Sequence, residues 1–269
     1  MNPPASDPIT TGSSLHKLQT ARLAKDRLLK DLAGNRFVLF SQAIEALTPS
    51  VRDAGYREIL VRFLDEEHNR QAPGMFLPLL EEQGLMPFLD RWVVKRTTQW
   101  IGSHDAGRGG ERAPRCSVNL SSDTIRRDRS FSDYVLECLR KASAHGAALS
   151  FEIPVADAVA PSLAQLVPAL RAAGCTFALS GFTGAEGEFE LASAVGFEIV
   201  KIDGSMLSSP SGEAQARARL ATIHARCKEL GMRTVCMQVE TPETLEILRG
   251  IGVDYAQGFG IERPRALES

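Results

Sequence analysis

The alternation of strand and helix patterns over the second half of the chain constrains its fold more than any other feature of the sequence. Short apolar runs are followed by amphipathic segments and joined by Gly-bearing turns, which predicts a parallel sheet with helices outside it. The expected strands are Arg115–Leu120, Ala148–Ile153, Cys175–Leu179, Phe197–Ile202, Arg233–Val239 and Asp254–Ala256. Five helices are expected between these strands. The first ends at about His145 and the second at Ala173, the third covers Glu188–Val195, the fourth runs from about Glu213 to Leu230, and the fifth ends at Gly250.

The first half adds two β-rich runs, Arg36–Ile44 and Glu58–Leu64. Helices are expected over Phe76–Gln83 and over Phe88–His104, whose aromatic stripe predicts core packing. Eight strands in a chain of 269 residues favour an α/β (β/α)8 TIM-like barrel, with a doubly wound sheet as the alternative.

The N-terminal segment reads differently from the barrel. Residues 1–14 are rich in Pro, Ser, Thr and Asp and predict a disordered tail. Residues 15–33 keep helical spacing and end at Gly34, so we expect one domain, residues 15–269, that includes this helix. The Gly- and Arg-rich stretch Asp105–Pro114 predicts a surface loop.

Composition gives no support to several classes of protein. A hydrophobic share of 43% and a net charge of −2 suit a globular protein and give no basic footprint for nucleic acid or a membrane surface. The cysteines lie scattered in apolar runs, which predicts small buried residues in a reducing compartment. With no signal-peptide pattern at the N-terminus, we expect a cytoplasmic location.

Polar residues gather where the expected strands end, which is the edge that carries the active site of a barrel. They are Glu58, Asn119, Glu152, Ser180, Lys201 with Asp203, Glu240 and Gln257. Carboxylate and amide oxygens are ligands for hard cations, while Lys201 and Arg62 could hold phosphate oxygens. The alternative is that these groups cap loops or pair with a nearby lysine. The loop Gly181–Gly187 has GxxGxxG spacing, a weak phosphate signal, and is expected to be mobile.

Several blocks in order resemble the EAL domain, the bacterial phosphodiesterase module for cyclic di-GMP. The Glu-Ala-Leu-Leu-Arg signature corresponds to Glu58–Arg62, with Gln42 preceding it. The other matching blocks are Pro73–Pro78, Asn119–Ser121, Lys201–Asp203 and Gln257–Phe259. The resemblance spans about Leu28 to Pro264 and implies a barrel whose first strand runs antiparallel.

Departures from the family pattern fall on its acids. The resemblance implies metal ligands at Glu58, Asn119 and Glu152, but the loop-holding acid is replaced by Val155. The two central aspartates fall on Ser180 and Gly181, and a further acid falls on Met237. Two-metal hydrolysis needs cations to make the nucleophile and stabilise the phosphate, and Ser, Gly and Met supply no such charge.

The sequence therefore predicts a catalytically inactive, degenerate EAL regulatory protein. No cofactor is expected, and Mg²⁺ or Mn²⁺ would matter only for residual hydrolysis by the remnants Glu58, Asn119, Glu152, Lys201 and Glu240. The resemblance implies a nucleotide groove lined by Gln42, Leu60, Arg62, Lys201, Glu240 and Gln257. Cyclic di-GMP or a protein partner could bind the chain, which could also form a homodimer. The alternatives are a weak residual cyclic di-GMP phosphodiesterase and a pure protein-interaction module.

Overall fold

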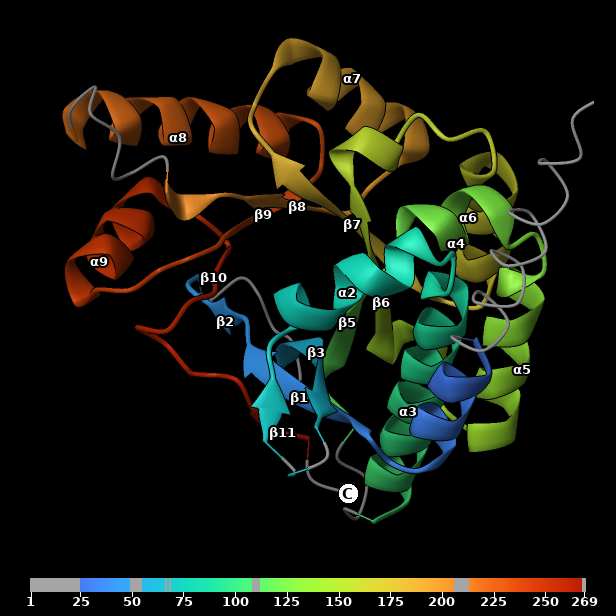
Figure 1. Ribbon diagram of the computed structural model, residues 1–269. Helices are drawn as coiled ribbons and strands as arrows, with labels where there is room; N and C mark the ends of the chain where they lie inside the picture. Colours follow the sequence, from blue (N-terminus) through green and yellow to red (C-terminus); the bar gives the residue numbers. More distant parts are fainter. Residues whose placement is uncertain are drawn as a thin grey trace, which may run out of the picture.

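A closed β-barrel forms the centre of the computed structural model, which describes residues 25–48, 55–65, 67, 69–107, 112–205 and 213–267. Neighbouring strands of its main wall pair in parallel and follow the order of the chain (Figure 1). They are β3 (Tyr56–Leu64), β5 (Arg115–Asn119), β6 (Leu149–Pro154), β7 (Thr176–Phe182), β8 (Ile199–Ile202), β9 (Arg233–Cys236) and β10 (Tyr255–Ala256).

One antiparallel segment closes this barrel. Strand β1 (Phe37–Ala43) pairs antiparallel with β3, and its direct continuation β2 (Glu45–Ala46) pairs antiparallel with β10. The two edges of the parallel sheet are therefore joined through consecutive residues. This arrangement confirms the predicted (β/α)8 barrel with an antiparallel first strand, and the doubly wound alternative is wrong because such a sheet stays open.

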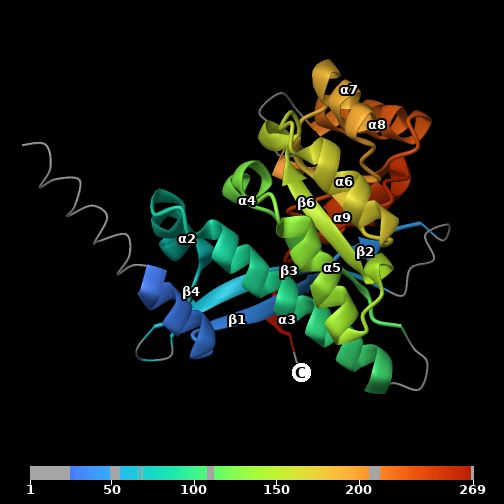
Figure 2. The same cartoon turned by 90° about the vertical axis from the view of Figure 1, so that its right-hand side faces the viewer.

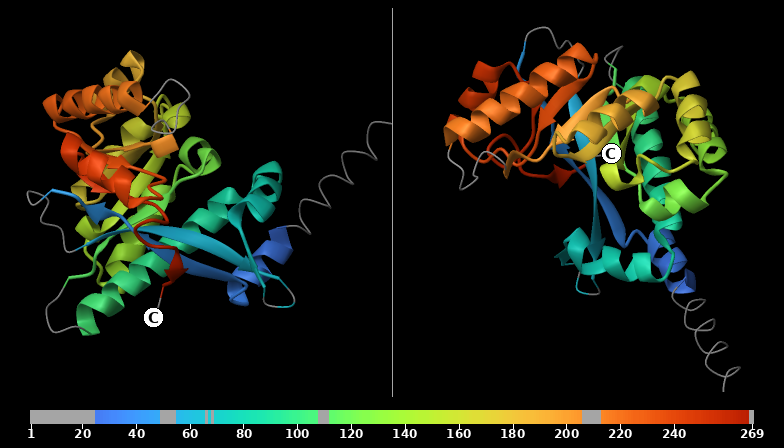
Figure 3. Two further views of the ribbon diagram at one scale, coloured as in Figure 1. Left: turned by 90° about the vertical axis from the view of Figure 1, so that its left-hand side faces the viewer. Right: turned by 90° about the horizontal axis from the view of Figure 1, so that it is seen from above.

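Helices cover the outside of the barrel (Figure 3). The helices in the first part of the chain are α2 (Pro73–Glu82), α3 (Met86–Gly107), α4 (Ser122–Arg127) and α5 (Phe131–Ala142). Those that follow are α6 (Leu163–Ala172), α7 (Glu186–Val195), α8 (Glu213–Glu229) and α9 (Pro242–Ile251). Short 3-10 turns lie at Gly146–Ala148 and Val155–Asp157, and the short strands β4 (Arg70–Gln71) and β11 (Arg265–Ala266) flank β3 and β1. In the part of the chain that the structure describes, no helix has the length and apolarity needed to cross a membrane.

Strands β1 and β3 form a hairpin that extends beyond the barrel (Figure 2). Its projecting end is packed with aromatic rings: Phe37 lies 5.0 Å from Phe63, 5.6 Å from Phe76 and 6.1 Å from Trp92 between ring centroids. The rings belong to β1, β3, α2 and α3, so they bind these elements into one apolar layer. The predicted packing role of the α3 stripe is confirmed for Trp92.

Some boundaries differ from the prediction. The single helix expected to reach His145 is broken, because Asp128 accepts hydrogen bonds from Arg91 and from the backbone of Ser130 and ends α4 there. Helix α3 continues past His104 to Gly107, so it includes the start of the expected loop. Residues 25–33 are helical, whereas the tail 1–14, the helix start 15–24 and loop residues 108–111 lie outside the described residues. All five cysteines are buried free thiols, as predicted.

Candidate functional site

A buried lysine occupies the centre of the barrel mouth. Lys201 on β8 is fully buried, and its Nζ donates to Glu58 Oε2 at 2.7 Å and to Glu152 Oε1 at 2.6 Å. Asn119 at the end of β5 donates its Nδ2 to Glu58 Oε1 at 2.8 Å. Three strands thus bring one ammonium and two carboxylates together, and Lys201 neutralises part of their charge.

The two carboxylates differ in their electrostatics. Burial raises the pKa of Glu58, but the charge of Lys201 and hydrogen bonds from Lys201, Gln257 and Asn119 outweigh burial and hold this pKa below its usual value. Burial and the charge of Glu58 raise the pKa of Glu152 despite its bond to Lys201. Burial lowers the pKa of Lys201, yet the two carboxylates raise it further, so this lysine stays charged. Glu58 is therefore the ionised partner and Glu152 the one that more readily takes a proton.

Two glutamines extend this network toward the closing strand. Gln257 donates its Nε2 to Glu58 Oε2 at 2.7 Å and to Gln42 Oε1 at 3.1 Å. Gln42 in turn donates to the backbone carbonyl of Glu262 at 2.7 Å. Gln257 Oε1 is buried and has no hydrogen-bond partner in the described part of the chain, so a donor group or a water there would satisfy it.

The inner face of the β1–β3 hairpin continues from this network. Its register places Gln42 opposite Glu58 and Phe40 opposite Leu60. The guanidinium of Arg62 lies 5.6 Å from the centroid of the Phe40 ring, and that of Arg70 lies 5.1 Å from it. Two cationic groups thus lie over the buried Phe40 ring next to the mouth, where they are placed to meet an anion.

A β-bulge holds the residues at the end of β7. Leu179 pairs with Val200 and Phe182 pairs with Ile202, so three steps on β7 face two on β8. The extra residue lies at Ser180–Gly181, where Gly181 has a φ of +73°. The bulge interrupts the pairing of Ser180 and Gly181 with β8, whereas Ser180 still pairs with Pro154 of β6.

The other predicted positions lie apart from the network. Glu240 is exposed beyond the end of β9, and Asp203 is exposed and accepts the backbone N–H of Ser205. Met237 packs against an apolar cluster inside the barrel, and half-buried Val155 begins a 3-10 turn after β6. Six of the predicted site residues therefore form one hydrogen-bond network: Gln42, Glu58, Asn119, Glu152, Lys201 and Gln257. Leu60, Arg62 and Glu240 take no part in that network.

Glu188 holds the loop that follows the bulge. Its carboxylate accepts the backbone N–H groups of Thr183 at 2.7 Å, Gly184 at 2.9 Å and Ala185 at 3.3 Å, and the Thr183 hydroxyl at 3.0 Å. One carboxylate therefore holds three consecutive amides of the stretch for which mobility is expected, and that mobility stays a prediction. Those amides are also not free to bind a phosphate.

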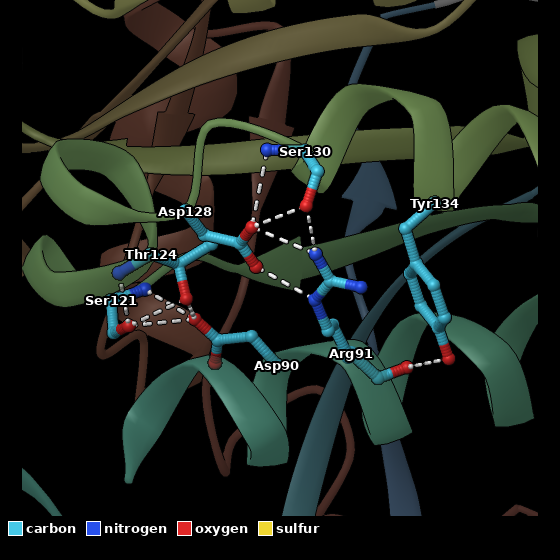
Figure 4. Close-up of polar contacts among 7 residues, drawn as sticks. All are labelled: Asp90, Arg91, Ser121, Thr124, Asp128, Ser130 and Tyr134. Carbon is cyan, nitrogen blue, oxygen red and sulfur yellow. Dashed lines mark hydrogen bonds and ion pairs between the residues drawn. The ribbon is translucent and has the colours of Figure 1, made fainter. Parts of the chain in front are cut away.

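Helix α4, which follows Asn119, is anchored at both ends by consecutive residues of α3 (Figure 4). Asp90 accepts the N–H of the N-cap residue Ser121 at 3.0 Å and its hydroxyl at 2.7 Å. At the other end of α4, the Arg91 guanidinium donates two hydrogen bonds of 2.7 Å to the Asp128 carboxylate. Burial raises the pKa of Asp90 to about 6, although the hydroxyls of Thr124 and Ser121 lower it. These contacts fix the chain immediately after Asn119.

The donor set does not fit a divalent cation well. Both oxygens of Glu58 already accept hydrogen bonds, and the Glu152 oxygen nearest the centre accepts from Lys201. Ser180, Gly181 and Met237 add no carboxylate, and a thioether is a poor ligand for Mg²⁺. Among the described residues, no group of three His, Cys, Asp or Glu side chains is placed to hold a metal.

Sequence reasoning missed several residues that support the site. The backbone carbonyl of Glu262 accepts a hydrogen bond from the Gln42 side chain. Its carboxylate accepts the backbone N–H of Ala43 and forms an ion pair with Arg57. Tyr56 lies beneath the lysine and donates to Ser117 at 3.3 Å. Glu262 is 220 residues from Gln42, and no local pattern signals such a pairing. For Glu188 a signal existed, since an acid at the third position of a helix commonly receives preceding amides.

Comparisons with known proteins agree with this architecture. The family model described as "EAL domain" matches residues 25–264. The cyclic di-GMP phosphodiesterase PdeF of Escherichia coli is 29% identical over 244 residues, which cover 90% of this chain and 32% of that protein. PdeB of Shewanella oneidensis, also a cyclic di-GMP phosphodiesterase, is 26% identical over 246 residues, covering 90% of this chain and 28% of that protein. The chain therefore spans about a third of the length of these relatives.

A solved structure shares the fold. The EAL domain of FimX from Pseudomonas aeruginosa, bound to cyclic di-GMP, superposes with a TM-score of 0.80 at 24% identity, covering 90% of this chain and 95% of that one. The chain belongs to the EAL domain family.

Proposed function

We propose that this chain is a cyclic di-GMP receptor that binds the nucleotide without hydrolysing it and acts as a regulatory module in cyclic di-GMP signalling. The observation that carries the proposal is the Lys201 centre, in which an ammonium occupies the space between Glu58 and Glu152. A lysine there supplies the positive charge that keeps two buried carboxylates together without a metal. The centre is therefore compact in the metal-free protein.

The chemistry of the mouth supports nucleotide binding. Arg62 and Arg70 lie over Phe40 beside the mouth, so phosphate oxygens would meet guanidinium donors. The unpartnered acceptor of Gln257 suits an N–H donor of a base. Ser180 and Gly181 remove two negative charges that would repel a dianionic ligand in the absence of a metal. FimX, which shares the fold, is a nucleotide-bound relative of the same architecture.

The absence of hydrolysis follows from the same residues. Hydrolysis would need a cation to activate water and stabilise charge on the phosphate. Among the remnants, both oxygens of Glu58 and one oxygen of Glu152 already accept hydrogen bonds from Asn119 and Lys201. We expect no turnover above background with Mg²⁺ or Mn²⁺.

Calorimetry with cyclic di-GMP tests binding. Titrations of the full chain in EDTA and in Mg²⁺ should give the same saturable heat, Arg62→Ala should weaken it, and the exposed control Arg249→Ala on α9 should not. Absence of heat in both buffers would refute the receptor proposal and leave a protein-interaction module. A heat that requires Mg²⁺ would contradict the metal-free mode.

Product analysis tests the loss of hydrolysis separately. Long incubation with Mn²⁺ should yield no more linear product than a Glu58→Ala variant yields. The triple variant Ser180→Asp, Gly181→Asp, Met237→Glu is a gain-of-metal comparison, and we expect it to bind Mn²⁺ where the parent chain does not. Turnover by the parent above the Glu58→Ala level would establish the residual phosphodiesterase instead.

A further inference from the structure

A groove runs along the outer face of α3, on the side of the molecule that carries the helical residues 25–33. One hollow of about 450 Å³ is lined by Leu29, Phe88, Arg91, Trp92, Lys95 and Tyr134, among others. A second of about 190 Å³ is shared between α3 and α5 and continues to Lys141. Lys95, Gln99 and Tyr134 line both hollows, so they form one feature, named here the α3–α5 groove.

The groove has the dimensions and spacing of a helix-binding seam. Its lining on α3 runs from Phe88 to Gln99 at steps of three and four residues, and on α5 from Tyr134 to Lys141 in the same way. Eleven residues of helix rise about 16 Å, which is three turns. Two neighbouring helices that expose matching stripes of this kind accept the apolar face of a third amphipathic helix. The helical residues 25–33 lie over one end, where Leu29 remains 41% exposed.

The groove is already rigid. Arg91 is fixed by Asp128 and by the Ser130 hydroxyl at 2.8 Å, and Tyr134 donates its hydroxyl to the Arg91 carbonyl at 3.1 Å (Figure 4). The Arg91 guanidinium lies 4.6 Å from the centroid of the Tyr134 ring. A preformed surface needs little ordering when a ligand binds, which favours affinity.

Charge selects the kind of helix. Arg91, Lys95, Arg96 and Lys141 line or border the groove, against the single acid Glu137 of its lining. Arg91 is paired with Asp128, and Lys141 with Glu137 at 3.1 Å. Lys95 and Arg96 are exposed, and neither forms an ion pair with another described residue. The Arg96 guanidinium lies 5.9 Å from the centroid of the Trp92 ring, and the Lys25 ammonium lies 4.5 Å from that of the Phe88 ring. The available charge at the groove is therefore positive beside an apolar floor.

We propose that the α3–α5 groove is a docking site for an acidic amphipathic helix of a protein partner. Its leucine-type side chains contact Leu29, Phe88 and Trp92, and its carboxylates lie against Lys95 and Arg96. The chain's own residues 1–24 fit less well, because they contain Lys17 and Arg22 and one acid, Asp7. This docking needs no nucleotide, so it stands or falls independently of the receptor function.

Fluorescence anisotropy with synthetic peptides tests the site. The probes are a panel of labelled peptides of about eleven residues with leucine at i, i+3, i+4 and i+7 and glutamate between, and a matched panel with lysine in place of glutamate. The full chain should bind acidic probes saturably and lysine probes at least about tenfold more weakly. Lys95→Glu with Arg96→Glu should abolish binding, and the exposed control Lys228→Glu on α8 should leave it unchanged, with circular dichroism confirming that each variant is folded.

Several outcomes would overturn the proposal. Failure of every acidic probe would do so, as would binding that ignores the Lys95→Glu and Arg96→Glu changes. Binding that appears only after residues 1–24 are deleted would assign the groove to the chain itself. Self-association that is abolished by the same two changes would assign it to a second copy.

Discussion

Replacing Lys201 by methionine should expose how the centre of the barrel is stabilised. The change shortens the side chain by one atom and removes one buried charge that lies 2.7 Å from a Glu58 oxygen and 2.6 Å from a Glu152 oxygen. At an effective dielectric constant of about 20, each contact represents roughly 6 kcal/mol of attraction, which the burial of three ions largely offsets. Removing the lysine leaves two buried carboxylates without a counterion, for which the expected loss is about 3–5 kcal/mol at pH 8.

The pH dependence identifies the cause of that loss. Without Lys201 the two carboxylates repel each other, so the folded variant holds at least one proton on Glu58 or Glu152 at a pH where the unfolded chain holds none. Stability then falls as pH rises, by about 1.4 kcal/mol per pH unit for one proton. Lowering the pH from 8 toward 5 should therefore recover most of the loss relative to the parent chain.

Urea unfolding at pH 5, 6, 7 and 8 measures both quantities. The matched control is the triple variant Lys201→Met, Glu58→Gln, Glu152→Gln, which has no charge at the centre and should show neither the large loss at pH 8 nor the steep slope. A Lys201→Met variant that loses less than about 1 kcal/mol, or that follows the slope of the parent, would refute the view that the ammonium compensates two buried carboxylates.

Three other changes test separate contacts. Glu188→Ala should release the loop after β7 and speed amide exchange at Thr183–Ala185, where Glu188→Gln should have a smaller effect because its carbonyl still accepts. As the pH rises from 4 to 7, the free energy of unfolding of Asp90→Asn should rise relative to that of the parent by up to about 3 kcal/mol. The reason is that the pKa of Asp90 is raised to about 6, so its ionisation is costly in the folded state. A difference between variant and parent that is the same at both pH values in urea unfolding would contradict this. Gly102→Ala should lower the thermal midpoint, because its methyl group would lie 1.9 Å from the carbonyl oxygen of Ala142 and push α3 from α5.

The alternation of patterns was sufficient to predict the barrel strands. Each strand is a short apolar run, because side chains cover both of its faces in the barrel. The apolar character and the length of the run therefore identify it in the sequence. The break between α4 and α5 was not predictable in this way. It depends on Arg91, which lies 37 residues before Asp128 and contacts it only in the folded chain.

For the site as well, local patterns predicted some residues, whereas contacts between distant segments decided the others. Glu58, Glu152 and Lys201 could be found because polar residues at the ends of apolar strands must lie at one edge of the barrel. That Lys201 pairs with both carboxylates could not be found, since pairing depends on the depth of each strand end and on the register between strands. Glu262 and Asp90 contribute through contacts with segments remote in sequence, and nothing in their own neighbourhoods distinguishes them from surface acids.

The β7 bulge makes the shape of the barrel independent of the side chains at positions 180 and 181. Leu179 and Phe182, on either side of the bulge, are fully buried, and their pairing with β8 sets the register whatever lies between them. Gly181 has a left-handed φ of +73°, where an aspartate would be strained by about 1–2 kcal/mol, and a Cβ there would meet no atom within 4 Å. Glycine therefore relieves backbone strain and removes no packing contact. For folding alone, glycine is therefore favoured over aspartate at this position.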